Sequence, residues 1–194
     1  VKIITTGEGG ASLTNDLLLA NRMKLLRSHG ITRNSSEMIQ PIEEPWYYEQ
    51  IDLGFNYRMT DIQAAMGISQ LDRLDKYINR RTEIAEYYGE KLNFNNFSSL
   101  EQKNDRRSSW HLYIIRISNG KKHRNNLVDV LIKNGIGVNL HYIPVYRHPY
   151  SSFKGKLDGA EKYYDSALTI PLFPSMSFKD VDFISSIINK NLDD

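Results

Sequence analysis

A lysine stands at the start of the chain, beside a β-prone run that ends in a glycine-rich turn. Lys2 precedes Ile3 to Thr6, and residues 7–10 read Gly-Glu-Gly-Gly, which supplies the positive φ angles of a tight reversal. With a second β-prone run at 11–14, the pattern predicts a β-hairpin. Lys2 is the candidate chemical centre of the chain. The hairpin alone favours a simpler interpretation, in which an exposed lysine sits at its edge.

A second candidate lies just before an expected helix. Residues 54–59 read Gly-Phe-Asn-Tyr-Arg-Met, and Thr60 is a suitable helix N-cap. The side chain of Asn56, together with backbone amides near the helix N-terminus, could hold a phosphate group. An Asx-turn that merely starts the helix explains the same residues, and the motif by itself favours that alternative.

A third candidate follows an expected strand. Residues 141–150 contain two histidines, three tyrosines and one arginine, a mixture that suits a ligand carrying rings and phosphates. The equal alternative is a proline-shaped surface loop whose tyrosines pack on the core. His141 and His148 have no third ligand at a recognisable spacing, so no metal site is predicted.

Two further histidines have structural explanations. His111 opens a strand with alternating sides, and we expect a structural histidine with satisfied hydrogen bonds. His29 follows a helix, where the helix dipole stabilises a cationic imidazole.

Two helical stretches separated by an irregular segment are expected after the hairpin. A helix is predicted at residues 16–28, closed by a basic last turn and Gly30. Residues 31–55 lose periodicity and resemble a binding loop or interface. From Thr60, apolar residues up to position 92 predict one long or broken helix, which connects two domains. The polar stretch 93–109 is expected to be a solvated excursion.

The second half alternates between strand and helix patterns. A strand is predicted at 112–117, a helix ending at Gly135, a strand at 136–140, and a terminal helix begun by Ser177 and Asp180 as a capping box. These elements predict a small α/β domain.

Composition limits the possible functions. The chain has 194 residues, of which 40% are hydrophobic, and a formal net charge of +2, which is too small for a nucleic-acid footprint. It has no cysteine and therefore no disulfide or thiol nucleophile. No apolar run suggests a membrane span, and we expect a soluble, cytoplasmic protein. The chain begins with Val1, and we expect it to be part of something longer.

Six motifs in the same order and spacing make the chain resemble the DegT/DnrJ/StrS sugar aminotransferases from end to end, in particular those that aminate a UDP-linked 4-keto-6-deoxy hexose. They are Lys2 to Gly10, Thr14-Asn15-Asp16, Arg27 to Gly30, Gly54 to Met59 with Asp61 to Ala65, Trp110 to Tyr113, and Val138 to Tyr146.

The resemblance implies a cofactor and a set of binding residues. Lys2 would bind pyridoxal 5'-phosphate covalently and act as the catalytic residue. Asn56 would reach the cofactor phosphate of the other subunit in a homodimer. His141 and Tyr142 would contact the nucleotide-linked keto sugar, with Tyr146 and Arg58 as neighbours.

The resemblance also implies a fold and a reaction. The chain would be the C-terminal half of a fold-type I transferase, with residues 1–75 ending the cofactor-binding large domain and 76–194 forming the connection and the small α/β domain. The reaction would move an amino group from glutamate to the sugar, in the synthesis of a cell-surface polysaccharide or glycan precursor. A catalytically silent fragment that serves as a dimerisation or sugar-nucleotide-binding module is the alternative. A third interpretation is the related sugar dehydratase branch, in which histidine replaces the lysine. Lys2 argues directly against it.

Overall fold

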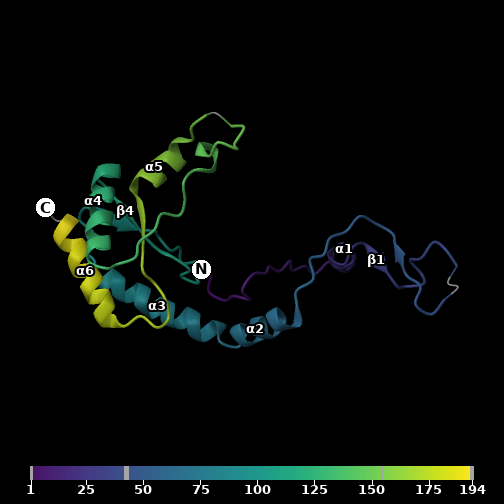
Figure 1. Cartoon of the computed structure of the whole chain (residues 1–194). Coiled ribbons are helices and arrows are strands. Elements are labelled where there is room, and N and C mark those ends of the chain that lie inside the picture. The colour runs from purple at the N-terminus through teal and green to yellow at the C-terminus, as the bar shows by residue number, and fades with distance from the viewer. Residues whose placement is uncertain (1, 42–43, 154, 193–194) are drawn as a thin grey trace. The chain divides into compact units, whose positions relative to one another are not determined.

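The computed structural model describes residues 2–41, 44–153 and 155–192 (Figure 1). Contacts divide the chain into two compact units, residues 3–72 (unit 1) and 73–194 (unit 2), and they group Lys2 with unit 2.

The first helix of unit 1 forms where the sequence predicts it. Helix α1 (Leu17–Arg27) begins after Asp16, whose Oδ1 accepts hydrogen bonds from the amides of Leu18 and Leu19 at 2.8 and 3.1 Å. It ends where Gly30, at φ +68°, donates its amide to the carbonyl of Leu25 at 3.0 Å. Local capping alone accounts for both ends of α1.

The hairpin predicted at residues 3–14 is wrong in its strands, although the turn at Gly7 has the expected positive φ of 82°. Within this segment the Gly7 amide donates to the Thr5 hydroxyl at 3.1 Å and the Thr6 hydroxyl donates to the Glu8 carbonyl at 3.0 Å. The Glu8 carbonyl also accepts from the side-chain amide of Gln63 at 2.9 Å, a contact that forms no strand ladder. A strand needs a partner ladder to satisfy its backbone. The described part of this chain offers these residues none.

The segment before helix α2 (Asp61–Leu71) lies against the end of α1. The amide of Phe55 donates to Leu26 at 2.7 Å, and that of Tyr57 donates to Arg27 at 3.0 Å. A Cβ on Gly54 would come within 2.2 Å of the backbone nitrogen of Gly30, so only glycine permits this approach. Residues 54–57 are thereby held in an extended form.

A short antiparallel pair closes the loop that the sequence leaves irregular. Strand β1 (Ile31–Thr32) pairs with β2 (Glu49–Gln50). The Glu49 carboxylate accepts hydrogen bonds from the amides of Ile39 and Gln40, both at 2.7 Å, and from the Tyr47 hydroxyl at 3.1 Å. The two amide donors lower the pKa of Glu49 below its ordinary value of 4.5.

This carboxylate should make the loop sensitive to acid. Because the folded state lowers the Glu49 pKa, its contribution is present above about pH 4.5 and is lost as the pH falls through the folded value. We expect the amide proton shifts of Ile39 and Gln40 to titrate together in that acidic range. In Glu49→Gln both titrations should disappear. If they persisted, another acid would hold the loop.

The expected long helix is broken into two. Helix α2 (Asp61–Leu71) is capped by Thr60, which forms a reciprocal capping box with Gln63. Helix α3 (Leu74–Lys91) starts after Arg73. The sequence leaves a continuous or a broken helix open, and the structure shows the break at Asp72 and Arg73, where the two units also divide.

Unit 2 is built on a three-stranded antiparallel sheet. Its order is β3 (Phe97–Ser99), β4 (Tyr113–Ile117) and β5 (Ala167–Ile170). Strand β4 is predicted correctly, but β3 lies inside the segment expected to be solvated, and β5 is not predicted. The strand expected at 136–140 is reduced to a single bridge between Asn139 and Thr169.

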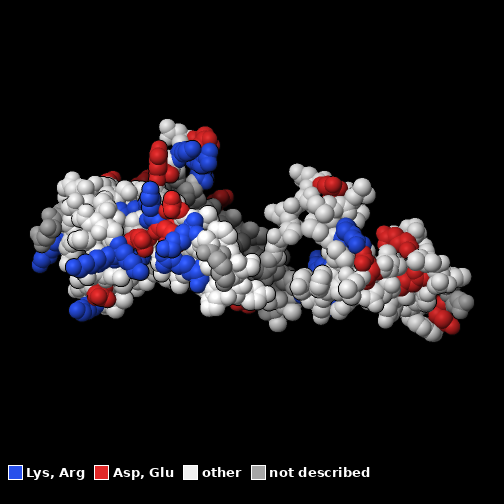
Figure 2. Space-filling view, turned by 90° about the horizontal axis from the view of Figure 1, so that it is seen from above, with Lys and Arg blue, Asp and Glu red and all other residues white. Residues whose placement is uncertain are grey.

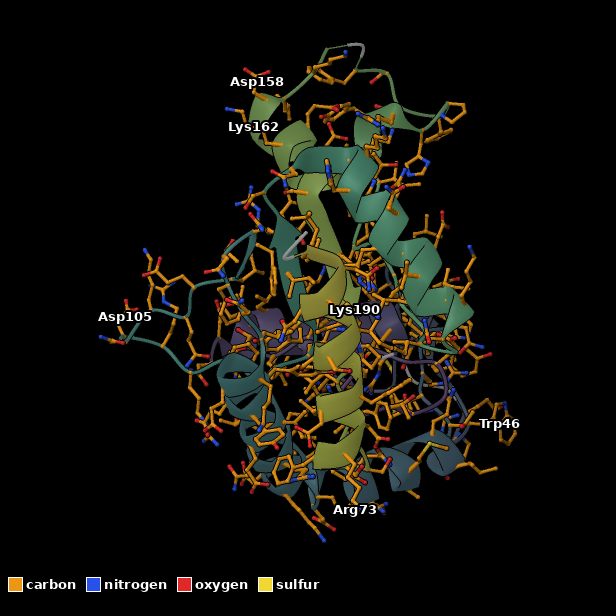
Figure 3. All side chains as sticks on the ribbon, turned by 90° about the vertical axis from the view of Figure 1, so that its left-hand side faces the viewer. Trp46, Arg73, Asp105, Asp158, Lys162 and Lys190 are labelled. Carbon is orange, nitrogen blue, oxygen red and sulfur yellow. The ribbon has the colours of Figure 1, made fainter. Side chains whose placement is uncertain are left out.

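Helices cover this sheet and complete the core. They are α3, α4 (Gly120–Lys133), α5 (Asp158–Ser166) and α6 (Phe178–Leu192), with a 3₁₀ turn at Val145–Arg147. Helix α6 packs along α3, and α4 contacts α5, α6 and β4 (Figure 3). The predicted capping box of α6 is confirmed, because the Asp180 amide donates to the Ser177 hydroxyl and the Ser177 amide donates to the Asp180 carboxylate.

Hydrogen bonds join α3 to α6 across nearly a hundred residues of sequence. The Tyr87 hydroxyl donates to Asp182 at 2.9 Å, and the Asn189 amide group donates to the Lys91 carbonyl at 2.9 Å. Between these helices lie Ile84, Tyr88 and Ile188, which are fully buried. Helix α6 is therefore required to complete the hydrophobic core of unit 2.

A buried arginine on α3 bonds to the backbone that precedes β4 and to the backbone that follows β5. Arg81 is only 5% exposed and donates to the carbonyls of Trp110, His111 and Leu172 at 3.1, 3.4 and 2.8 Å. Burial lowers the pKa of Arg81 from its ordinary value. The guanidinium thus fixes the chain just before β4 and just after β5.

The two units differ sharply in their burial of apolar side chains. All members of the hydrophobic core lie between Ile84 and Leu192. In unit 1 the described large apolar side chains are partly or fully exposed, including Leu13, Leu17, Leu18, Leu53 and Ile62. Unit 1 therefore keeps its helices without a core of its own.

The charged surface is mixed, and on the face in Figure 2 the Lys and Arg side chains lie among Asp and Glu side chains. None of the helices among the described residues is long and apolar enough to cross a membrane.

Candidate functional site

Lys2 is exposed, and its contacts group it with unit 2. Among the described residues, its ammonium group has no hydrogen bond and no acidic partner. Its positive charge helps to lower the pKa values of two histidines of unit 2, His111 and His141. The amine is therefore not neutralised by a described carboxylate, and its electrostatic neighbours are imidazoles.

His111 does not have the satisfied hydrogen bonds that the sequence predicts. Its buried Nδ1 has no partner among the described residues, although its backbone carbonyl accepts from Arg81. Burial lowers the pKa of His111, and the positive charges of Lys2 and Arg81 lower it further. The ring is thus held toward its neutral form.

His141 is half-buried and anchored at two points. Its Nδ1 lies 2.8 Å from the hydroxyl of Thr169 on β5, and its carbonyl accepts from the Tyr163 hydroxyl at 3.1 Å. Burial lowers the pKa of His141, with the charge of Lys2 as a further cause. A neutral imidazole in fixed orientation results.

The loop after His141 divides into an exposed part and an anchored part. Tyr142 is 67% exposed, and its ring meets that of His141 edge-on, with centroids 4.6 Å apart. The hydroxyl of Tyr146 instead donates to Glu161 on α5 at 2.8 Å, and Arg147 pairs with the same carboxylate. Tyr142 is thus available to a ligand, whereas the Tyr146 hydroxyl already has a partner within unit 2.

Asn56 and Arg58 belong to unit 1, in the extended segment before α2. Asn56 is exposed, and its backbone bridges Ser28. The helix is capped by Thr60, so the Asx-turn interpretation of Asn56 is wrong. Arg58 is exposed and lines an open cavity of about 1180 Å³ that also borders Gly9, Gly10 and the α1 residues Met23 and Arg27.

The structure therefore brings some of the predicted site residues together. His141 and Tyr142 are adjacent in unit 2, and Lys2 acts electrostatically on His141. Asn56 and Arg58 share one segment of unit 1. No cluster of three metal-ligating side chains occurs among residues 2–41, 44–153 and 155–192.

The chain belongs to the DegT/DnrJ/EryC1/StrS aminotransferase family, whose model matches residues 1–189. The UDP-4-amino-4,6-dideoxy-N-acetyl-β-L-altrosamine transaminase of Campylobacter jejuni is 36% identical over 97% of this chain and 49% of its own length. The spore coat polysaccharide biosynthesis protein SpsC of Bacillus subtilis is 36% identical over 93% of this chain and 49% of its own length.

A solved structure shows the same fold. The Helicobacter pylori PseC aminotransferase, involved in the biosynthesis of pseudoaminic acid, superposes with a TM-score of 0.88 at 30% identity, over 100% of this chain and 51% of that one. This chain is a mixed α/β fold consistent with the C-terminal half of a fold-type I enzyme. It spans about half the length of the curated relatives it matches.

Two residues of this region are missed from the sequence. Thr169 contacts His141 from an unpredicted strand, and Arg81 holds the backbone of His111 from a helix thirty positions away. A threonine within the apolar run Ala167 to Ile170 is the one available signal for the first of them. Nothing local marks Arg81, because its partners are backbone carbonyls.

Proposed function

We propose that this chain forms part of a pyridoxal 5'-phosphate-dependent aminotransferase that moves an amino group from glutamate to a nucleotide-linked 4-keto-6-deoxy sugar. The products are 2-oxoglutarate and the 4-amino sugar, so the transfer is balanced. The observation that carries the proposal is the family match over residues 1–189, which places Lys2 within the matched region. The similarity to the Campylobacter jejuni transaminase supports the class of sugar.

The residues present fit this cofactor in their chemistry. Lys2 offers an amine without a described carboxylate partner, as a lysine that bonds to an aldehyde requires. Lys2 and Arg81 both bring positive charge near His111, and positive charge favours an anionic, phosphorylated ligand. When bound, the cofactor would act as the electron sink for amino transfer.

Each residue of this chain has a proposed task. Lys2 would hold the cofactor and move the proton that amino transfer requires. His141 and Tyr142 would orient the nucleotide sugar, with Arg58 beside it, and Tyr146 would support the loop through Glu161. Asn56 would reach the cofactor phosphate in the partner subunit of a homodimer. The exposed apolar side chains of unit 1 support a surface that another polypeptide covers.

A chimera can test the role of Lys2. We would join this chain to the first half of the Campylobacter jejuni transaminase, add pyridoxal 5'-phosphate, reduce with borohydride and map the modified peptide. The adduct should be found at Lys2 and should be absent in Lys2→Ala, with activity reduced by several orders of magnitude. Lys133→Ala, on α4, should retain both. A reducible adduct that survives Lys2→Ala would remove Lys2 from the mechanism.

The second candidate function is a catalytically silent module for dimerisation or sugar-nucleotide binding. It is favoured by the exposed large apolar side chains of unit 1, among them Leu13, Leu17 and Leu18, which a second polypeptide could cover. We expect the isolated chain to form no stoichiometric adduct with pyridoxal 5'-phosphate. Binding of UDP without adduct formation, in both the isolated chain and the chimera, would support this second candidate instead.

A further inference from the structure

Thr169 is a polar residue in a strand that is otherwise apolar. All four residues of β5 are buried, with exposures of 1%, 1%, 7% and 2% from Ala167 to Ile170. Valine has nearly the shape of threonine and no hydroxyl to satisfy, so stability alone gives no reason for threonine here. The hydroxyl of Thr169 has one hydrogen-bond partner among the described residues, the Nδ1 of His141 at 2.8 Å.

The backbone holds the two side chains in this arrangement. Thr169 pairs with Ile114 of β4 on one side and with Asn139 on the other. The Asn139 pairing uses two hydrogen bonds, at 3.1 and 2.8 Å, and Asn139 lies two residues before His141. The Tyr163 hydroxyl on α5 then fixes the His141 carbonyl at 3.1 Å. His141 is therefore placed by three neighbouring segments of unit 2.

The available donors and acceptors determine whether Thr169 or His141 donates the proton in this hydrogen bond. A threonine hydroxyl has one proton to donate, and no carbonyl or carboxylate of the described residues accepts it. If Nδ1 carried the ring proton and donated to Thr169, the buried hydroxyl proton would be left without an acceptor. If the hydroxyl donates to Nδ1, both groups are satisfied, and the ring proton must reside on Nε2.

We propose that Thr169 is a positioning residue that fixes His141 as the Nε2–H tautomer, so that the ring presents one N–H donor to an oxygen of the bound nucleotide sugar. The Nε2 atom has no partner among the described residues, and His141 is half-buried, so this donor remains available. The ligand in this statement rests on the proposed function. The tautomer rests on the geometry of unit 2 alone.

Nitrogen-15 NMR of the isolated full chain can measure the tautomer directly. The ring signals of His141 are assigned by their loss in His141→Gln and recorded at about pH 8.5, roughly two units above the ordinary histidine pKa of 6.5. Three variants are compared, namely Thr169→Val, Thr169→Ser and the control Thr82→Val. The Thr82 hydroxyl donates to a carbonyl of its own helix and is also partly buried.

In the wild type we expect Nδ1 to resonate as a bare nitrogen and Nε2 as a protonated one. Thr169→Val should shift the two resonances toward each other, because the tautomers then mix. Thr169→Ser should restore the wild-type pattern, and Thr82→Val should leave it unchanged. A proton on Nδ1 in the wild type, or resonances unmoved in Thr169→Val, would overturn the inference. Circular dichroism of each variant shows whether the fold is kept.

A second measurement separates the inference from the proposed function. UDP is titrated into the chimera, and the Nε2–H signal of His141 is followed. A shift on binding supports the ligand contact, whereas binding without a shift overturns the assigned role of His141 toward the nucleotide. Because the tautomer is measured in the isolated chain without ligand, its result does not depend on this titration.

Discussion

Amide hydrogen exchange on the isolated chain should show strong protection in α4 and weak protection in α1 and α2. The opening free energies should differ by at least about 3 kcal/mol, or roughly a hundredfold in protection factor. The reason is burial. Helix α4 places Arg124, Leu127 and Leu131 in the core, whereas neither α1 nor α2 has a buried residue.

Helix capping alone predicts the opposite order of protection, with α1 and α2 above α4, so the measurement separates the effect of burial from that of capping. Asp16 caps the N-terminus of α1 with two hydrogen bonds and Thr60 forms a capping box on α2, whereas the N-cap of α4 makes no side-chain hydrogen bond. A cap contributes about 1 kcal/mol, much less than several buried apolar side chains at about 1.5–3 kcal/mol each. Isolated helices of this length are also marginal in water.

Equal protection in the two units would contradict this account. It would mean that residues 3–72 bury their apolar side chains in the isolated chain, against a partner or against themselves. Sedimentation at the same concentration distinguishes these outcomes, because coverage by a second copy would double the mass. Protection that rises with concentration would likewise indicate self-association.

Replacement of Arg81 by methionine should destabilise unit 2 by about 2–4 kcal/mol, with a loss in Tm on the order of 10 °C. Methionine keeps much of the apolar stem but leaves the carbonyls of Trp110, His111 and Leu172 without their donor. Removal of a buried guanidinium also relieves its own desolvation, so the net loss is smaller than three broken bonds would suggest. Denaturant unfolding followed by circular dichroism measures the change.

Arg106 is the matched control. It pairs with Asp105, the two side chains are 63% and 66% exposed, and Asp105 projects from a loop away from the helices (Figure 3). Arg106→Met should change stability by less than about 0.5 kcal/mol. If Arg81→Met were equally silent, the three carbonyls would be satisfied by water, and Arg81 would not organise the sheet.

Local signals predicted the helices well and the sheet poorly. Asp16, Thr60 and the Ser177–Asp180 box act within one helical turn, so the sequence suffices to place α1, α2 and α6. The sequence does not reveal strand β3, because it has only three residues and depends on pairing with β4, where the buried Phe97 lies opposite Ile117. Strand β5 is held by β4 and Asn139, partners that lie far away in the sequence.

The candidate site shows the same contrast between residues that local motifs identify and residues that act through long-range contacts. Family motifs name Lys2, Asn56, Arg58, His141, Tyr142 and Tyr146 as residues of interest, and their roles remain proposals. The motifs do not include the residues that hold these side chains and their neighbours in place. The contact from Thr169 to His141 and the hold of Arg81 on the His111 carbonyl join residues 28 and 30 positions apart, a distance that no local pattern spans.

The bonds between α3 and α6 also determine when unit 2 can form during synthesis. Tyr87 and Lys91 on α3 bond to Asp182 and Asn189 on α6, partners that leave the ribosome almost a hundred residues later. Until then the side of α3 that packs on α6 has no partner, because that helix has not been made. Folding of unit 2 therefore waits for the synthesis of α6, and during that interval the nascent chain exposes an apolar face of α3 that we expect to be prone to aggregation.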